Sequence, residues 1–362
     1  MTDTELRQLC HTHLPGHRQP TPAQLFAAMS AWCDANDVTH DTYGCGALIQ
    51  QFEAKVARLL GFESALFCIT GTMTQATALR IACMERGSRL VALHPTAHIL
   101  RHERGNHQLF DHFQALQIGD PHRPWTLPEL QGVPDTLGAA LLELPMREIG
   151  GQCPAWDDLA AIKDHCRAQG IHLHLDGARL WEAAAGYGRS AGEIAAGFDS
   201  IYVSLYKGIG GMGGAMLLGT APLVAKAQEW FRRQGGNVYQ RTPYVVAAAM
   251  QFDARLAAMP DYFRRTEWLY QVLADYPIFA PNPARPHASM LHLHLPVARD
   301  HALDIRNRIA QQHGVWLFNG AHHAALPGRC SVELYVGDNL LYLPDARVRE
   351  ILGLWSDAMA AQ

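Results

Sequence analysis

Two short, mainly apolar segments near the middle of the chain each lead into a residue with reactive chemistry. The first runs from Ile171 to Leu175 and is followed by Asp176, and the second runs from Ile201 to Leu205 and precedes Lys207. Runs of this length are typical of strands in a buried sheet. We therefore expect Asp176 and Lys207 at the carboxyl edge of that sheet, where open α/β sheets bind ligands.

Short apolar runs alternate with longer amphipathic ones along much of the chain, which favours a mostly parallel sheet covered by helices. The pattern predicts strands over 65–69, 89–93, 139–144, 171–175, 200–205 and 214–218, and helices over 72–86 and 156–168. After residue 244, helical stretches at 244–258, 300–313 and 345–360 bracket alternating segments at 289–295 and 331–336. We expect an N-terminal arm over 1–35, a large domain over 36–243 and a smaller α+β domain over 244–362.

Asp176 and Lys207 together suit one kind of cofactor. A lysine with a pKa lowered by desolvation can bond to a carbonyl group and later move protons. A carboxylate can keep a pyridine nitrogen protonated, and the two groups are the protein's share of pyridoxal-phosphate chemistry. The alternative for Lys207 is a surface lysine beside a glycine turn. The alternative for Asp176 is the N-cap of a helix over 178–187.

Five segments carry a family resemblance. In chain order they are TGTMTQATAL, TAHILRHERG, ELPMREIGG, HLDGARLW and SLYKG. Together they resemble the threonine aldolase and β-eliminating lyase family of pyridoxal-phosphate enzymes, from about Tyr43 to Arg329. The resemblance implies the fold type I architecture: a large, mostly parallel sheet with helices on both faces, followed by a smaller C-terminal α+β domain.

The resemblance also implies roles for individual residues. The catalytic candidates are Lys207, His98 and Asp176. The candidates for binding the cofactor are Lys207, Asp176, Arg179, Gly71, Thr72, Met73, His98 and Ser204. The candidates for binding the substrate are Arg329, Arg179, Tyr43 and Glu103.

Physical arguments support some of these roles, and each has a plainer alternative. Gly71 to Met73 lie between a strand and a helix, where backbone amides bind phosphate, although a tight turn would look the same. Arg329 can clamp a carboxylate in a bidentate manner. The alternatives are a surface arginine for Arg179 and a lone polar histidine for His98.

One departure from the family leaves the reaction open. Met146 occupies the position of a family histidine assigned to proton transfer or to recognition of the substrate β-hydroxyl, and methionine can do neither. We expect a lyase that cleaves a β-hydroxy-α-amino acid, of the L-threonine or L-allo-threonine type, to glycine and an aldehyde. The alternatives are β-elimination, or another reaction at the α-carbon, and a pyridoxal-phosphate-binding protein without turnover.

Composition narrows the partners and the compartment. A hydrophobic fraction of 48% and a charged fraction of 18% describe a globular protein, and a net charge of −4 gives no electrostatic case for nucleic acid. We expect a small-molecule substrate. No run suits a signal or membrane-spanning segment, and the eight cysteines lack CxxC spacing, so we expect free thiols in the cytoplasm.

Two other patterns are discounted. The segment 208–213 satisfies GxGxxG, but a strand is expected after it where a dinucleotide site needs a helix. The 20 histidines form no cluster at metal-ligand spacing, so we expect no transition-metal site.

The resemblance finally implies a homodimer or homotetramer with active sites at the subunit interface. A glycine-rich loop over 232–241 would reach the neighbouring subunit, and Arg232, Arg233 or Arg241 would bind phosphate there.

Overall fold

The computed structural model describes residues 2–109 and 112–361, which form two compact units. The larger unit comprises Pro20–Glu148 and Gln152–Ala257, and the smaller comprises Met1–Gln19, Ile149–Gly151 and Ala258–Gln362. No helix in the described part of the chain has the length and apolar character needed to span a membrane.

These bounds differ from the expected domain bounds at three places, one of which is the short segment Ile149–Gly151 of the smaller unit. The first residues of the chain belong to the smaller unit, because β1 (Thr12–His13) pairs in parallel with β11 (Val315–Trp316). Helix α11 (Thr242–Leu273) runs without a break through the expected boundary at residue 244 and contributes to both units. A two-residue strand and a continuous helix give no boundary signal in the sequence pattern.

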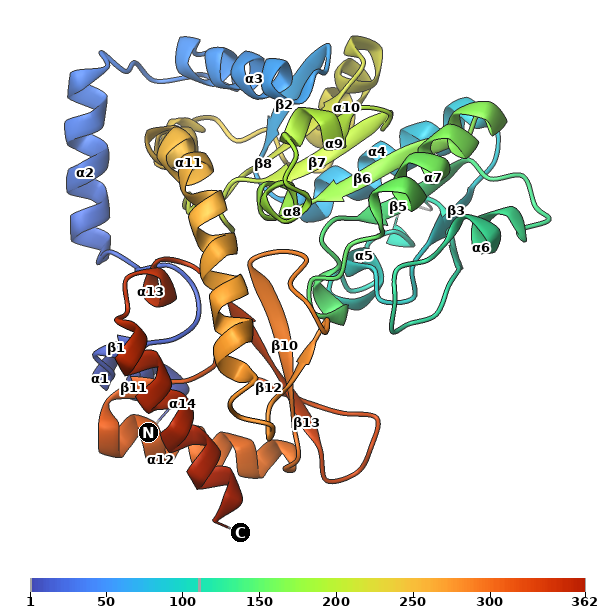
Figure 1. Cartoon of the computed structure of the whole chain (residues 1–362). Helices are drawn as coiled ribbons and strands as arrows, with labels where there is room; N and C mark the ends of the chain where they lie inside the picture. Colours follow the sequence, from blue (N-terminus) through green and yellow to red (C-terminus); the bar gives the residue numbers. More distant parts are fainter. Residues whose placement is uncertain (1, 110–111, 362) are drawn as a thin grey trace. The chain divides into compact units, whose positions relative to one another are not determined.

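A seven-stranded sheet forms the centre of the larger unit, in the order β2-β8-β7-β6-β5-β3-β4 (Figure 1). Its strands are β2 Ser64–Cys68, β3 Leu90–Leu93, β4 Gln114–Gln117, β5 Ala139–Glu143, β6 His172–Gly177, β7 Ser200–Ser204 and β8 Ala215–Gly219. Only β8 runs antiparallel to its neighbours in this sheet, so the carboxyl ends of the other six strands lie along the same edge. The six predicted strands are confirmed to within two residues, and β4 was not predicted.

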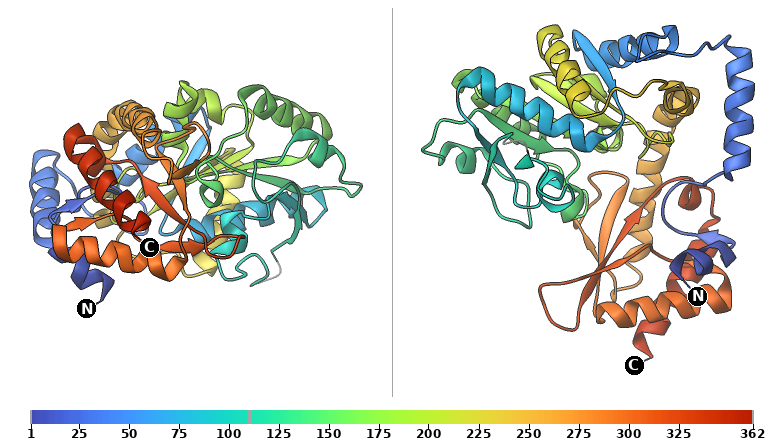
Figure 2. Two further views of the ribbon diagram at one scale, coloured as in Figure 1. Left: turned by 60° about the horizontal axis from the view of Figure 1, so that its bottom comes forward. Right: turned by 180° about the vertical axis from the view of Figure 1, so that it is seen from behind.

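Helices cover both faces of this sheet, as expected (Figures 1 and 2). Helices α4 and α10 pack on one face, and α7, α8 and α9 lie on the other. The helices of the unit besides α11 are α2 Pro22–Ala35, α3 Ala47–Leu60, α4 Gly71–Arg86, α5 His98–Arg101, α6 Leu127–Gln131, α7 Trp156–Gln169, α8 Leu180–Tyr187, α9 Ala191–Ala195 and α10 Ala221–Arg233. A short 3₁₀ helix, Arg147–Ile149, follows β5. Helix α4 stops at Gly87, whose φ of +69° suits glycine.

Two histidines are buried inside this sheet. The Nε2 atom of His172 and the Nδ1 atom of His174 both lie 2.7 Å from the hydroxyl oxygen of Ser200, on the neighbouring strand. A single hydroxyl can donate to one ring and accept from the other. Burial lowers the pKa of His172, and burial together with the neighbouring His172 lowers the pKa of His174 to about 3. Both rings therefore stay neutral and serve as polar core residues.

The smaller unit is built on a four-stranded antiparallel sheet in the order β12-β13-β10-β9. Its strands are β9 Ala280–Asn282, β10 Met290–Leu295, β12 Ala321–His323 and β13 Cys330–Tyr335, and its helices besides α11 are α1 Asp3–Leu9, α12 Arg299–His313, α13 Asp338–Leu341 and α14 Asp345–Ala360. Buried and half-buried residues alternate along β13, as the sequence predicted. The buried side chains of β10 and β13 form the core with α12 and α14.

The buried histidines predict a loss of stability in acid. His174 has a folded-state pKa near 3 and an unfolded value near 6.5, so its contribution is fully present above pH 6.5 and is lost as pH falls toward 3. One such group adds a limiting slope of about 1.4 kcal/mol per pH unit. His174→Asn should therefore reduce the pH dependence of the unfolding midpoint between pH 6.5 and 4. His313→Asn, at an exposed position, is the control. Equal slopes in the two variants would contradict this account.

Candidate active site

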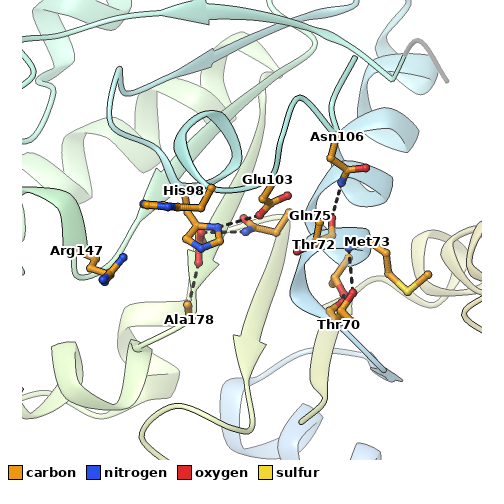
Figure 3. Close-up of polar contacts among 12 residues, drawn as sticks. Thr70, Thr72, Met73, Gln75, His98, Glu103, Asn106, Arg147 and Ala178 are labelled. Carbon is orange, nitrogen blue, oxygen red and sulfur yellow. Dashed lines mark hydrogen bonds and ion pairs between the residues drawn. The ribbon is translucent and has the colours of Figure 1, made fainter. Parts of the chain in front are cut away.

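The carboxyl edge of the large sheet gathers reactive side chains from several connections (Figure 3). Gly71 follows β2, His98 follows β3, and Glu143 ends β5. Asp176 lies at the end of β6, and Lys207 lies three residues after β7. The strand order therefore brings together residues that are far apart in the sequence.

Asp176 is buried and held from two sides. Its Oδ2 atom accepts a hydrogen bond of 2.9 Å from the Nε2 of Gln75, and its Oδ1 atom accepts one of 3.1 Å from the backbone of Ala178 (Figure 3). Helix α8 begins at Leu180 with Arg179 as its N-cap, so the helix-cap alternative for Asp176 is wrong. The two hydrogen bonds fix the carboxylate at the sheet edge.

Lys207 differs from the other three lysines of the chain. Lys55 pairs with Asp253, Lys226 pairs with Glu85, and Lys163 donates to the carbonyl of Ile194. Within the described residues, the Lys207 amine takes part in no hydrogen bond or ion pair, and it lies 5.8 Å from the centre of the Tyr206 ring. An amine with no ionic partner is free to react.

The surroundings of Lys207 favour its neutral, nucleophilic form. Burial lowers the pKa of this amine, and the positive charge of Arg179 lowers it further, although Asp176 and Glu143 oppose that shift. Ser204 fixes the turn, because its hydroxyl oxygen accepts hydrogen bonds of 3.3 Å from the backbone of Tyr206 and Lys207. Ser204 itself is buried.

The start of α4 is packed closely. Thr70 caps the helix by accepting a 3.5 Å hydrogen bond from the backbone of Met73, and the side chain of Asn106 donates to the carbonyl of Thr72 at 2.8 Å (Figure 3). A Cβ on Gly71 would overlap the ring and hydroxyl of Tyr202. The first backbone N–H groups of a helix have no acceptor within the helix, which makes this end suitable for an anion.

His98 and Glu103 form a hydrogen-bonded pair. The Nδ1 of His98 lies 3.0 Å from the Oε1 of Glu103, whose side chain is buried. The hydrogen bond to Glu103 raises the pKa of His98 against the effect of burial, and the charge of Asp176 adds to the rise. Burial raises the pKa of Glu103. Both shifts favour a proton on this pair.

Two buried residues of this cluster were missed in the sequence. Glu143 lies opposite Asp176 in the parallel register of β5 and β6, and its Oε1 accepts a 3.1 Å hydrogen bond from the backbone of Arg147. Burial, with the charge of Asp176, raises the pKa of Glu143 to about 7. Gln75, the donor to Asp176, has a buried Oε1 with no partner in the described structure. The end position of Glu143 on a predicted strand was the available signal.

The remaining residues singled out in the sequence lie at different places in the fold. Arg179 is half-buried at the start of α8, and Met146 is buried with its backbone paired to Gln152. Tyr43 is 45% exposed, has a φ of +51°, and packs edge-on against Tyr239. Arg329 belongs to the smaller unit, where it precedes β13 and is exposed.

The three arginines of the predicted phosphate-binding loop are engaged within the chain. Arg232 pairs with Glu229, and Arg233 lies 5.1 Å from the ring of Trp230. Arg241 is buried and donates to the carbonyl of Phe67 and to the side chain of Asn237. Arg241 also has a buried Nε with no partner among the described residues.

Comparison with known families places the chain that carries this site. Residues 20–296 match the model of the beta-eliminating lyase family, which is more than half of the chain. The chain belongs to the beta-eliminating lyase family. The resemblance that its sequence motifs carry is confirmed.

Relatives with similar sequences and structures support this placement. The low specificity L-threonine aldolase of Saccharomyces cerevisiae is 30% identical over 61% of this chain and 57% of that enzyme, so the match spans little more than half of the yeast protein. A structure from Exiguobacterium sp. 255-15, assigned as an aromatic amino acid beta-eliminating lyase/threonine aldolase, has a TM-score of 0.92 at 34% identity and covers 98% of this chain and 99% of its own.

A second structure, assigned as an L-allo-threonine aldolase of Listeria monocytogenes EGD-E, has a TM-score of 0.90 at 34% identity and covers 99% of this chain and 98% of its own. The match therefore extends over both units. The predicted fold class, fold type I with a large sheet domain and a smaller C-terminal domain, is confirmed.

The close packing at the start of α4 predicts that Gly71 tolerates no side chain. Gly71→Ala should push Tyr202 or the helix aside and lower the free energy of unfolding by about 1–3 kcal/mol, the usual cost of overpacking. Urea denaturation measures this loss. Gly320→Ala is the control, because a Cβ there would meet no atom within 4 Å. An equal and small effect of both substitutions would show that the contact with Tyr202 is not restrictive.

Proposed function

We propose that this protein is a pyridoxal-phosphate-dependent carbon–carbon lyase. Its substrate is a β-hydroxy-α-amino acid of the L-threonine or L-allo-threonine type, and its products are glycine and an aldehyde. The observation that carries this proposal is that Asp176 and Lys207 lie at the same edge of the sheet. Asp176 is buried and held by two hydrogen bonds, and the surroundings of the Lys207 amine lower its pKa.

The residues at this edge fit pyridoxal phosphate. Lys207 would attach to the cofactor, and Asp176 would hold its ring nitrogen protonated. The N-terminus of α4, with Ser204, would bind the phosphate, because the first N–H groups of the helix, at Gly71 and Thr72, have no acceptor within the helix. Gln75 suits a polar ligand, since its buried Oε1 has no partner among the described residues. When bound, the cofactor draws electrons from the α-carbon of the substrate.

His98 is the proposed base for the substrate β-hydroxyl. Its Nδ1 is bound to Glu103, so its Nε2 is the nitrogen left to exchange a proton. The raised pKa of His98 suits a group that must hold the proton it has taken. This role replaces that of the family histidine at the position of Met146. Substrate carboxylate binding by Arg179 and Arg329, and the contribution of Tyr43, stay predictions.

The second candidate function is β-elimination, and the buried Met146 favours it. A thioether cannot take a proton from a hydroxyl, whereas elimination needs removal of the α-proton and a leaving group on the β-carbon. Lys207 would supply the base for that reaction. The cofactor site is common to both reactions, so the products of turnover distinguish them.

We further propose a cytoplasmic homodimer or homotetramer. In α2 only Met29 is buried, and Phe26 is 54% exposed, so much of an apolar helix lacks cover within the chain. Tyr43 and Tyr239 add exposed aromatic rings at the loops near Gly44 and Arg241. Exposed apolar surface of this kind suits a second copy of the chain. The eight free cysteines suit a reducing compartment.

The lysine assignment can be tested directly, because the chain has four lysines. The holoenzyme is treated with borohydride, which fixes the cofactor to its lysine, and peptides are then mapped by mass spectrometry. We expect the label on Lys207. Lys207→Ala should lose both the label and the visible absorbance of the bound cofactor, whereas Lys226→Ala should keep both. Label on Lys163 or Lys55 would refute the assignment.

A further inference from the structure

A pocket of about 680 Å³ lies entirely within the smaller unit. It lies between α1, the segment after α1, and the residues around α13, whose positions Figure 1 shows. Its charged and titratable lining residues are Arg7, Arg18, His11, His13 and His17. No carboxylate lines it. The pocket shares no residue with the cluster around Lys207.

The acidic residues of the surrounding elements are engaged with groups other than Arg7 and Arg18. Asp3 pairs with Arg306 at 2.7 Å, and the carboxylate of Glu5 accepts from the backbone of Thr2. Asp338 accepts a 2.6 Å hydrogen bond from the hydroxyl of Tyr262 and lies 3.4 Å from the Nδ1 of His17. These contacts leave the two pocket arginines without a counter-charge.

Arg7 and Arg18 form no ion pair within residues 2–109 and 112–361. Arg7 is half-buried in the last turn of α1. Arg18 is exposed, and its guanidinium lies 5.2 Å from the ring centre of Tyr342, another lining residue. Two arginines kept in a concave site without carboxylates are an arrangement that an anion would stabilise.

The pKa of His13 is affected by the positive charges around this pocket. Its Nε2 lies 3.0 Å from the carbonyl of Cys10, which can only accept, so Nε2 carries the proton. Its Nδ1 is buried and has no partner in the described structure. Burial lowers the pKa of His13, and the charges of Arg7 and His11 lower it further, while the Cys10 carbonyl opposes them. A bound anion would offset the two charges.

We propose that this pocket binds a small, multiply charged oxyanion of the phosphate-ester or polycarboxylate class. The planar guanidinium groups of Arg7 and Arg18 suit bidentate recognition of such oxygens. The volume lies within the about 300–1,000 Å³ of small-molecule sites. The net charge of −4 disfavours an extended polyanion, so the concave pocket takes a small ligand.

The test uses borohydride-reduced holoenzyme, in which the cofactor fills its own site. Inorganic phosphate, adenosine 5′-monophosphate and citrate are titrated in turn, with binding followed by ³¹P line width or by calorimetry. We expect saturable binding of at least one of them. The ester and citrate arms show whether a phosphate or a polycarboxylate is preferred. Arg7→Gln with Arg18→Gln should weaken that binding by about tenfold or more.

Two further variants keep the test decisive. Arg308→Gln removes an exposed arginine of α12, in the same unit but outside the pocket, and should leave binding unchanged. Tyr342→Ala alters a side chain that is 62% exposed, so it should fold normally and weaken binding by releasing Arg18. The proposal is overturned if no probe binds saturably, or if the double arginine variant and Tyr342→Ala both bind as the unaltered protein does.

Discussion

The parallel pairing of β5, β6 and β7 is the constraint on which the candidate active site depends. Their register sets Glu143 opposite Asp176 and Asp176 opposite Tyr202, so that the ends of three buried strands meet at one edge. Lys207 follows within the turn that Ser204 fixes. A slip in register by one residue would exchange the side chains on the two buried faces and disrupt their packing, so the position of each reactive group is set by the packing of the whole sheet.

Charges at this edge act on one another. Asp176 raises the pKa of Glu143, and the arginines at positions 179 and 147 lower the pKa of Lys207. A Glu143 that holds its proton near neutral pH gives less support to the positive form of Lys207. A protonated Glu143 thus opposes the lowering of the Lys207 pKa less than a carboxylate would, and a lower pKa favours the form of the amine that attacks a carbonyl. The pKa of His98 is raised in the same way, first by its hydrogen bond to Glu103 and further by the charge of Asp176.

The sequence predicted which reactive residues follow the strands better than it predicted the contacts among side chains. Apolar runs located six strands, and the resemblance located Lys207, Asp176 and His98, but β4 (QALQ) is too short and polar to stand out. The role of Gln75 could not be predicted, because its partner Asp176 lies 101 residues away in the sequence. Helix periodicity predicts only which face of the helix a residue lies on. Asp176 was also a plausible helix cap, and only the start of α8 at Leu180 excludes it.

The central claim concerns the bond that breaks, and product analysis tests it most directly. The holoenzyme is incubated with L-threonine, L-allo-threonine and phenylserine, and glycine and aldehyde are measured beside pyruvate, other 2-oxo acids and ammonia. The account predicts glycine with an equimolar amount of aldehyde from at least one substrate. Oxo acid and ammonia without glycine would contradict it and would establish elimination in place of aldol cleavage.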